Sequence, residues 1–380
     1  MKIKNKILTS VSLYHSISDG SIAVISILFP IFKSIFNLNY TQVGIITGGG
    51  LIVTLISQLI IGQYADGKNS AKLLSTGILL VCISMLLLTQ SNSYVTLILF
   101  ILILRFSSSF FHPIGVGWIS RTFKKDRIDW AMGIQSGCAD IGAFISVSTT
   151  LYISGIYGWS IPLYLWSIIG AIILLIGIFL TFRIDEEYLF VNKIIKKQSL
   201  KKSVLKNIQL LKRIKLLSPA FIISGAAWGV TITFLPLLLY ERTTLSLPFI
   251  GILVALWIGF GSIISFAYGK IASILDRKKI IQICYTILGL TGLALSVFTN
   301  TYILILIMIL LGISTFLTYP ALFSFISEAT HESIEGKTFG IIFTLQLGGG
   351  TILLFLSGLF SDIYGIWIPF ALIGVLSLLY

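Results

Sequence analysis

The sequence predicts an all-α polytopic membrane protein, with twelve transmembrane helices arranged as two six-helix bundles. Three observations support this. Of the 380 residues, 56% are hydrophobic and only 11% are charged, with a mean hydropathy of +1.00, whereas soluble proteins carry about 25% charged residues. Apolar runs of about 17 to 27 residues recur, each long enough to cross a hydrocarbon core of ~30 Å at ~1.5 Å per residue. The second half of the chain also repeats features of the first.

The apolar runs are continuous rather than alternating in polarity, which favours helices over a barrel because helices satisfy their backbone groups within the lipid. The first run is too long and too polar for a cleaved signal peptide, so we expect it to remain as a membrane anchor. The twelve predicted spans are 9–33, 42–64, 71–90, 94–120, 128–153, 160–183, 216–240, 247–269, 279–298, 301–327, 336–358 and 364–380.

The basic residues fix the predicted orientation. With the N-terminus inside, 24 of the 27 Lys and Arg residues fall in cytoplasmic segments, and the exceptions are Lys33, Arg105 and Arg242. The positive-inside rule then places both termini in the cytoplasm of a multi-pass plasma-membrane protein. The net charge of +13 therefore mostly reflects the basic cytoplasmic loops that set the membrane orientation. This argues against a nucleic-acid partner and predicts some attraction to anionic membrane lipid.

The predicted domains are an N-terminal six-helix bundle (1–183), a basic cytoplasmic linker (184–215) and a C-terminal six-helix bundle (216–380). A shift of 207 residues lays Pro113 on Pro320 and Pro162 on Pro369. Glycines coincide at the same shift, with Gly44, Gly62, Gly133 and Gly142 meeting Gly251, Gly269, Gly340 and Gly349. Six spans per half make this a parallel repeat, in which two halves close around a midplane site and rock against each other.

The sequence offers little for chemistry other than transport. The three cysteines lie inside predicted spans without CxxC spacing, and the three histidines are scattered, so we expect no metal site and no enzyme active site. No phosphate-cradling glycine loop is present, so no nucleotide cofactor or direct ATP drive is expected. Because one chain contains both halves, we expect a monomer.

Polar residues form stripes inside two spans. In the first span they recur at helical spacing from Ser12 through His15 and Ser16 to Asp19, and in the fourth from Arg105 through Ser108 and Ser109 to His112. In the fifth span Gly133 and Gly137 predict a seam for close helix approach, with Asp140 further along that face.

Depth separates three of these residues from the rest. At ~1.5 Å per residue, Asp19, Arg105 and Asp140 all lie ~16–18 Å from the membrane entry of their spans, near the middle. Ionisable groups at that depth mark pathways. One arginine neutralises only one carboxylate, so we expect Asp19 or Asp140 to gain and lose a proton while Arg105 pairs with the deprotonated form. A fixed structural ion pair is the alternative.

The second half has no acid or base at corresponding depth. Charged groups on one wall and aromatic or neutral polar groups on the other suit a small amphipathic organic solute. The predicted cavity residues are His15, Ser16, Ser108, Ser109, His112, Gln135, Trp228, Trp257, Tyr319 and Gln346.

Twelve spans, a basic central loop, the repeat and the turn GQYADGKNSAK from Gly62 resemble the major facilitator superfamily of secondary transporters. The family's loop pattern is kept at Gly62 and Asp66, and its repeat, GKIASILDRKK from Gly269, carries the acid three positions later at Asp276. The resemblance implies alternating access, a cytoplasmic gate at these four residues and a proton-driven cycle.

Within that superfamily, YHSISDGSIAVISILFPIFKSIFNLNYTQVGII and SSSFFHPIG are similar to the fosmidomycin-resistance group of efflux carriers. Arg105 stands where drug–proton antiporters of the superfamily often carry an arginine. The fifth span, GIQSGCADIG, lacks the proline of many antiporters, so proton antiport, symport and uniport all remain open. The resemblance favours export of a drug-like compound, while Arg105 is equally consistent with import of an organic anion. A channel or scramblase is the alternative of another class, although the second half is too apolar to complete a polar pore.

Overall fold

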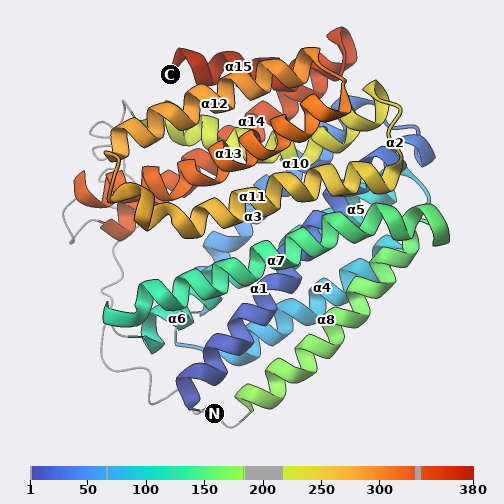
Figure 1. The fold of residues 1–380 in the computed structure, drawn as a ribbon. Helices are drawn as coiled ribbons and strands as arrows, with labels where there is room; N and C mark the ends of the chain where they lie inside the picture. The colour runs from blue at the N-terminus through green and yellow to red at the C-terminus, as the bar shows by residue number, and fades with distance from the viewer. Residues whose placement is uncertain (1, 66, 124, 183, 185–216, 330–334) are drawn as a thin grey trace. The chain divides into compact units, whose positions relative to one another are not determined.

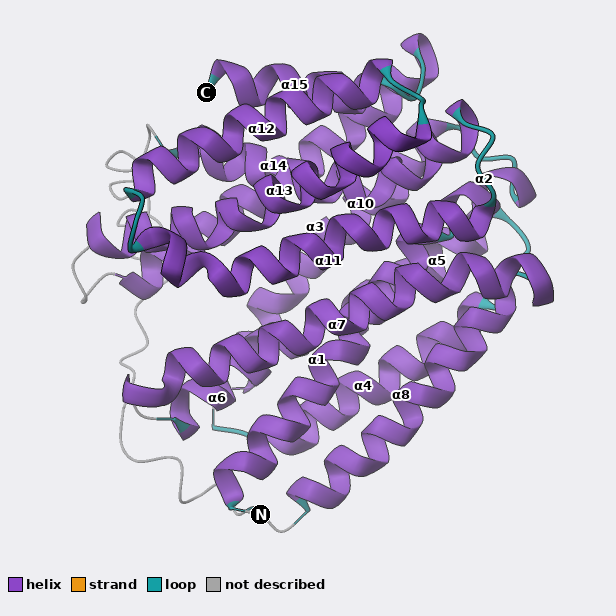
Figure 2. Ribbon diagram, in the orientation of Figure 1, coloured by secondary structure: helices purple, strands orange, loops and turns teal. Residues whose placement is uncertain are grey.

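The computed structural model describes residues 2–65, 67–123, 125–182, 184, 217–329 and 335–380. Every regular element within these residues is a helix, and Figure 2 shows no strand among them. The helices are α1 (Ile3–Ile27), α2 (Phe29–Ile35), α3 (Tyr40–Ala65), α4 (Ser70–Leu88), α5 (Tyr94–Ser108), the π-helix η1 (His112–Val116), α6 (Gly117–Thr122), α7 (Lys125–Tyr157), α8 (Ser160–Thr181), α10 (Ser218–Arg242), α11 (Leu247–Ala272), α12 (Arg277–Val297), α13 (Thr301–Ala329), α14 (Glu335–Tyr364) and α15 (Ile368–Leu379).

The predicted fold class is confirmed. Ten stretches of the described chain are long and apolar enough to cross a membrane, and the bent pair of α1 and α2 makes an eleventh. The twelfth predicted span corresponds to α15, an apolar helix of 12 residues. The outer surface fits a lipid environment, since large apolar side chains such as Phe179 and Phe182 are 83% and 80% exposed.

Proline interrupts two of the predicted spans. The first span bends by 48° between α1 and α2, next to Pro30. The fourth divides into α5, η1 and α6, and Pro113 lies at the start of η1. Proline has no backbone N–H to donate and its ring clashes with the preceding turn, so an α-helix bends or ends nearby.

The chain clusters into two compact units. Unit 1 comprises Met1–Leu38, Gly49–Asn192 and Thr244–Ala255, and unit 2 comprises Asn39–Gly48, Lys193–Thr243 and Leu256–Tyr380. Helices α3 and α11 therefore each contribute residues to both units. Most of the predicted linker, residues 185–215, lies outside the described residues, so the three-part domain division stays a prediction.

Each unit repeats the same packing scheme, which Figure 1 shows for the labelled helices. In unit 1, α1 packs mainly on α7 and α8, and α4 packs on α8 and α5. The helices of unit 2 that the repeat relates to these pair in the same way, α10 with α14 and α15, and α12 with α15 and α13. The parallel repeat read from the prolines and glycines is therefore present in the helix contacts.

Glycines set the tightest helix crossings. A Cβ atom added at Gly142 on α7 would collide with the backbone carbonyl of Ser16 on α1, and one at Gly225 on α10 would collide with that of Gln346 on α14. Of the two glycines in the expected seam, Gly137 is buried, but the prediction was wrong for Gly133, because a Cβ there would meet nothing within 4 Å. Spacing along α7 showed that glycines share a face, but only the fold shows which glycine lies at the crossing.

The repeat extends to a pair of contacts made by α3 and α11. A Cβ at Gly44 would lie 2.7 Å from the carbonyl oxygen of Leu354 within unit 2, and one at Gly251 would lie 2.8 Å from that of Val147 within unit 1. Both residues of the second contact are related to those of the first by the shift that aligns the two halves. Glycine is needed at both places because each helix approaches the backbone of its neighbour.

Candidate functional site

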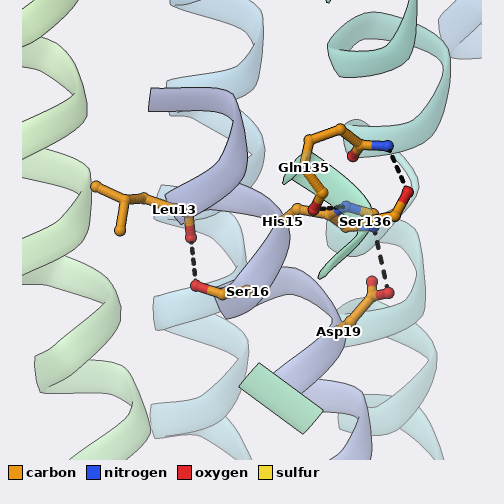
Figure 3. Close-up of polar contacts among 6 residues, drawn as sticks. All are labelled: Leu13, His15, Ser16, Asp19, Gln135 and Ser136. Atoms are coloured by element: carbon orange, nitrogen blue, oxygen red, sulfur yellow. Dashed lines mark hydrogen bonds and ion pairs between the residues drawn. The ribbon is translucent and has the colours of Figure 1, made fainter. Parts of the chain in front are cut away.

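Two of the described ionisable groups at depth form a close pair on α1. His15 and Asp19 are one helical turn apart, and His15 Nε2 lies 3.3 Å from Asp19 Oδ2 (Figure 3). The His15 side chain is only 6% exposed and that of Asp19 is 34% exposed. The i, i+4 spacing that the sequence showed thus produces a close pair, with the imidazole enclosed and the carboxylate accessible.

Two neighbours hold the His15 ring in one orientation. His15 Nδ1 lies 3.0 Å from the backbone carbonyl oxygen of Gln135 on α7, and Figure 3 shows this contact on the far side of the ring from Asp19. Phe111 stacks on the same ring with centroids 4.0 Å apart and an interplanar angle of 15°. Phe111 is 2% exposed, so the stack is part of the packed interior and fixes where Nε2 points.

The Gln135 contact also determines the protonation of the ring. A carbonyl oxygen only accepts hydrogen bonds, so Nδ1 carries the proton and donates it. In a neutral imidazole Nε2 then presents a lone pair, and it faces an oxygen of Asp19 that also has only lone pairs to offer when ionised. Nε2 makes no hydrogen bond. Nε2 and Oδ2 would therefore repel each other at this distance if neither carried a proton. A proton or a metal ion between the two atoms removes the repulsion.

The fourth predicted span supplies two more basic groups. The His112 ring meets the His15 ring edge-on with centroids 5.3 Å apart, and Arg105 acts electrostatically on Asp19. Nitrogen and oxygen atoms of His15, Asp19 and His112 lie within 4.8 Å of one another. The histidines are therefore not all scattered, as the sequence suggested, because folding brings two of the three together with Asp19.

Local structure explains why these groups face α1. Helix α5 ends at Ser108 and the chain resumes as a π-helix at His112, a feature that recurs at functional sites because it redirects side chains. The Ser109 hydroxyl donates to the Arg105 carbonyl at 2.7 Å, which satisfies one backbone acceptor near the break. The Arg105 side chain lies against Gly50 of α3, where an added Cβ would be 3.0 Å from Arg105 Cγ.

Other predicted residues of unit 1 fall into different environments. Asp140 is half-buried on α7 and is not a member of the His15–Asp19–His112 cluster. The Ser16 hydroxyl donates to the Leu13 carbonyl at 2.8 Å (Figure 3). Ser108 and Ser109 are buried, at 5% and 0% exposure, so in this structure neither presents a surface to a solute.

In unit 2, two predicted cavity residues converge on Ser224 of α10. The Tyr319 hydroxyl donates to the Ser224 carbonyl at 3.1 Å, and Gln346 Nε2 donates to the Ser224 hydroxyl at 3.2 Å. Trp228 is half-buried on the same helix. Trp257 is fully buried and packs edge-on against Phe316, 5.7 Å between centroids, so it is a packing residue here.

The predicted gate residues have different environments within their own units. Asp66 lies outside the described residues. Gly62 lies near Pro113, since an added Cβ would be 3.4 Å from Pro113 Cβ, whereas Gly269 has open space around it. The Asp276 side chain accepts from the Lys278 backbone N–H and so caps the N-terminus of α12.

Asp276, which caps α12, does not align with Asp66 under the repeat, although the loop pattern in the sequence suggested that it is the corresponding acid. Asn69 occupies the position in the first half that the repeat aligns with Asp276, and it caps α4 in the same way by accepting from the Lys72 backbone N–H. Asp276 is therefore the structural counterpart of Asn69 rather than of Asp66.

One polar network in unit 2 was missed from the sequence. The Asp362 carboxylate accepts hydrogen bonds from the backbone N–H groups of Tyr40 and Thr41, both at 2.8 Å, and from the Thr41 hydroxyl at 2.5 Å. The Tyr40 hydroxyl donates to Glu241. Asp362 therefore caps the N-terminus of α3 from the far end of the chain. A lone acid at the end of a predicted span was the only available signal.

These features define a class of protein, a helical membrane carrier with ionisable groups at depth in one of two repeated bundles. The sequence profile of the Major Facilitator Superfamily matches residues 11–350, and the chain belongs to that family of solute transporters. Transport of a solute, rather than enzyme chemistry, is the activity that this family implies.

Named relatives match parts of the chain. It is 29% identical over 109 residues to the uncharacterized MFS-type transporter YfnC of Bacillus subtilis (strain 168), a stretch covering 29% of this chain and 27% of that one. It is 25% identical over 172 residues to the riboflavin transporter RibZ of Clostridioides difficile (strain 630), covering 45% and 37%. The matches thus span well under half the length of these relatives.

Solved structures match the whole fold. A bacterial homologue of the human lysosomal transporter Spinster, in an inward-facing and unoccupied conformation, has a TM-score of 0.80 at 14% identity, covering 100% of this chain and 94% of that one. The nucleoside transporter NupG has a TM-score of 0.80 at 15% identity, covering 100% and 97%. At these identities the likeness shows the fold alone.

Proposed function

We propose that this protein is a secondary active transporter that exports a small drug-like or amphipathic organic compound by alternating access, in exchange for protons. The observation that supports it best is the His15–Asp19 pair, in which a lone pair of a buried imidazole faces an accessible carboxylate across 3.3 Å. A proton in that gap makes an ion pair, and its departure leaves two groups that repel. Proton binding is thereby coupled to the local geometry of α1.

The other charges have complementary roles in this proposal. Arg105 compensates Asp19 when the proton has left, because its charge already acts on that carboxylate. His112 is the exposed member of the cluster and passes protons between the pair and water. Asp140, on the helix that carries Gln135, remains a second candidate for the proton-carrying carboxylate.

The two units offer different groups to a solute. Unit 1 offers the charged cluster on α1. In unit 2, Tyr319 and Gln346 meet at Ser224 and offer hydrogen-bonding groups, while Trp228 offers an aromatic face. Charged groups in one half of the sequence and aromatic or neutral polar groups in the other favour an amphipathic solute. Export by a member of the fosmidomycin-resistance group stays a proposal that rests on the sequence resemblance.

A proton symporter or uniporter that imports a small organic anion is the second candidate. Arg105 favours it, because a guanidinium at depth would bind a carboxylate or phosphate of the solute. We further propose a plasma-membrane location with both termini in the cytoplasm, a monomer, and a cytoplasmic gate at Gly62, Asp66, Gly269 and Asp276. A channel or scramblase is disfavoured by the apolar second half.

The test uses proteoliposomes that contain a pH-sensitive dye, the purified protein, and a panel of amphipathic drugs and small organic anions. We expect certain compounds to evoke proton movement in the wild type and Asp19→Asn to abolish it, and Asp140→Asn tests the second candidate carboxylate on α7. Loss in Asp140→Asn alone would move the proton site to Asp140. Solute flux without proton movement, unchanged in Asp19→Asn, would refute proton coupling and indicate a uniporter.

A further inference from the structure

The gap between His15 and Asp19 has the geometry of two ligands on one metal ion. Two ligand atoms that are each ~2.1 Å from a tetrahedral ion lie ~3.4 Å apart, and His15 Nε2 and Asp19 Oδ2 are 3.3 Å apart. Nε2 is enclosed, makes no hydrogen bond and points at the carboxylate. We propose that His15, Asp19 and His112 bind a divalent transition-metal ion of the Zn²⁺ class, and this inference does not depend on proton coupling.

The surroundings of His15 are those of a metal ligand. A ligating histidine usually donates its other ring N–H to a backbone carbonyl or a carboxylate, which fixes the tautomer and makes the ligating nitrogen more basic. His15 Nδ1 donates to the Gln135 carbonyl at 3.0 Å in this way, and the Phe111 stack prevents the ring from turning. The first ligand is therefore pre-oriented before any ion arrives.

His112 completes the set with a small movement. Its ligand nitrogen lies within 4.8 Å of the other two ligand atoms, and the residue is exposed although its ring meets that of His15 edge-on. A rotation that closes this distance to ~3.4 Å gives two imidazoles and one carboxylate, with a fourth position open to water. Imidazole nitrogen selects Zn²⁺, Co²⁺, Ni²⁺ or Cu²⁺ over the hard ions Mg²⁺ and Ca²⁺.

The charges nearby limit the affinity and provide a control. The cluster supplies one negative charge from Asp19, and the positive charge of Arg105 acts on that same carboxylate. Arg105 therefore competes with a bound cation. Removing this charge in Arg105→Gln should tighten metal binding several-fold, an effect opposite in sign to that of losing a ligand.

The experiment uses the full-length chain in lipid nanodiscs, with Co²⁺ as a spectroscopic probe and Zn²⁺ titrated by calorimetry. We expect one ion per chain, visible d–d absorption of tetrahedral intensity that Zn²⁺ abolishes, and at least tenfold weaker binding in His15→Gln and Asp19→Asn. Equal elution volumes and melting temperatures without metal show that these variants are folded. Wild-type protein that binds no Co²⁺, or folded variants that bind it as tightly as wild type, would overturn the proposal.

A variant that adds a spectroscopic signal tests the proposal even if His15→Gln and Asp19→Asn do not fold. His112→Cys places a thiol on the exposed ligand position and should add a thiolate-to-cobalt charge-transfer band. We expect the wild type to lack this band, because none of its three cysteines is a proposed ligand. His331→Cys, at the one remaining histidine of the chain, is the matched control and should add no such band. Co²⁺ binding by His112→Cys without the band, or an equal band in His331→Cys, would show that residue 112 is not a ligand.

Discussion

Replacement of Gly142 by alanine tests the tightest crossing in unit 1. An alanine Cβ at this position on α7 would lie 2.8 Å from the carbonyl carbon and the Cα of Ser16, and closer still to its carbonyl oxygen. All three atoms belong to the backbone of α1, so no change of rotamer relieves the contact. The two carbon atoms alone require a separation from 2.8 to at least 3.4 Å, and the nearer carbonyl oxygen requires a larger one.

Two opposing terms set the size of the effect. Alanine favours a helix over glycine by about 1 kcal/mol, while overpacking a close interface costs about 1–3 kcal/mol. The upper part of that range applies because both partners are helix backbones, so Gly142→Ala should be destabilised by about 1–2 kcal/mol. Gly133→Ala, on the same helix, meets nothing within 4 Å and should gain up to about 1 kcal/mol.

The assay compares apparent melting temperatures of the wild type and both variants in one detergent at one scan rate, since membrane proteins commonly unfold irreversibly. Gly142→Ala should melt below the wild type and Gly133→Ala at or above it, separated by roughly 1–4 °C for a chain of this length. Because α7 carries the Gln135 carbonyl that orients His15, Gly142→Ala should also weaken Co²⁺ binding. Equal melting temperatures for the two variants would refute the crossing as described.

The remaining predictions concern polar contacts in unit 2. Asp362→Ala removes the acceptor of three hydrogen bonds at the start of α3 and should cost about 1–2 kcal/mol. In the same melting assay Asp276→Ala, which removes one cap hydrogen bond, should lower the melting temperature less than Asp362→Ala does. A larger decrease for Asp276→Ala would contradict the capping role of Asp362. Tyr319→Phe removes the hydrogen bond to the Ser224 carbonyl and should lower stability by about 0.5–1.5 kcal/mol. Tyr302→Phe, at an 83% exposed residue, should leave the melting temperature unchanged. Equal melting temperatures for the two variants would show that the Tyr319 hydrogen bond is not stabilising.

Spans and repeat could be predicted because they depend on local or periodic properties of the chain. A run of apolar residues is readable as a membrane span wherever it occurs, and prolines and glycines at one offset reveal two copies of a plan. The bend at Pro30 and the break at Pro113 follow from the missing N–H of proline. The Gly133 seam was wrong because a glycine's partner lies on another helix, about which spacing within α7 says nothing.

Only part of the candidate site could be predicted from the sequence, for a related reason. The i, i+4 spacing predicted that His15 and Asp19 share a helix face, but the partner expected for Asp19 was Arg105. The partners that give the pair its chemistry, Gln135 through its backbone carbonyl and Phe111 through its ring, come from helices far along the chain. A backbone carbonyl has no signature in a sequence, and neither does the tautomer that it imposes.

Hydropathy, segment length and helical period are enough to predict that this chain crosses a membrane repeatedly as helices and carries ionisable groups at depth. Which groups meet across helices was visible only in the folded chain, where His112 joins His15 and Asp19 and Asp362 caps α3. These outcomes depend on distances between segments that are far apart in the chain, and such distances are set by how helices pack against one another rather than by the order of residues within any one of them.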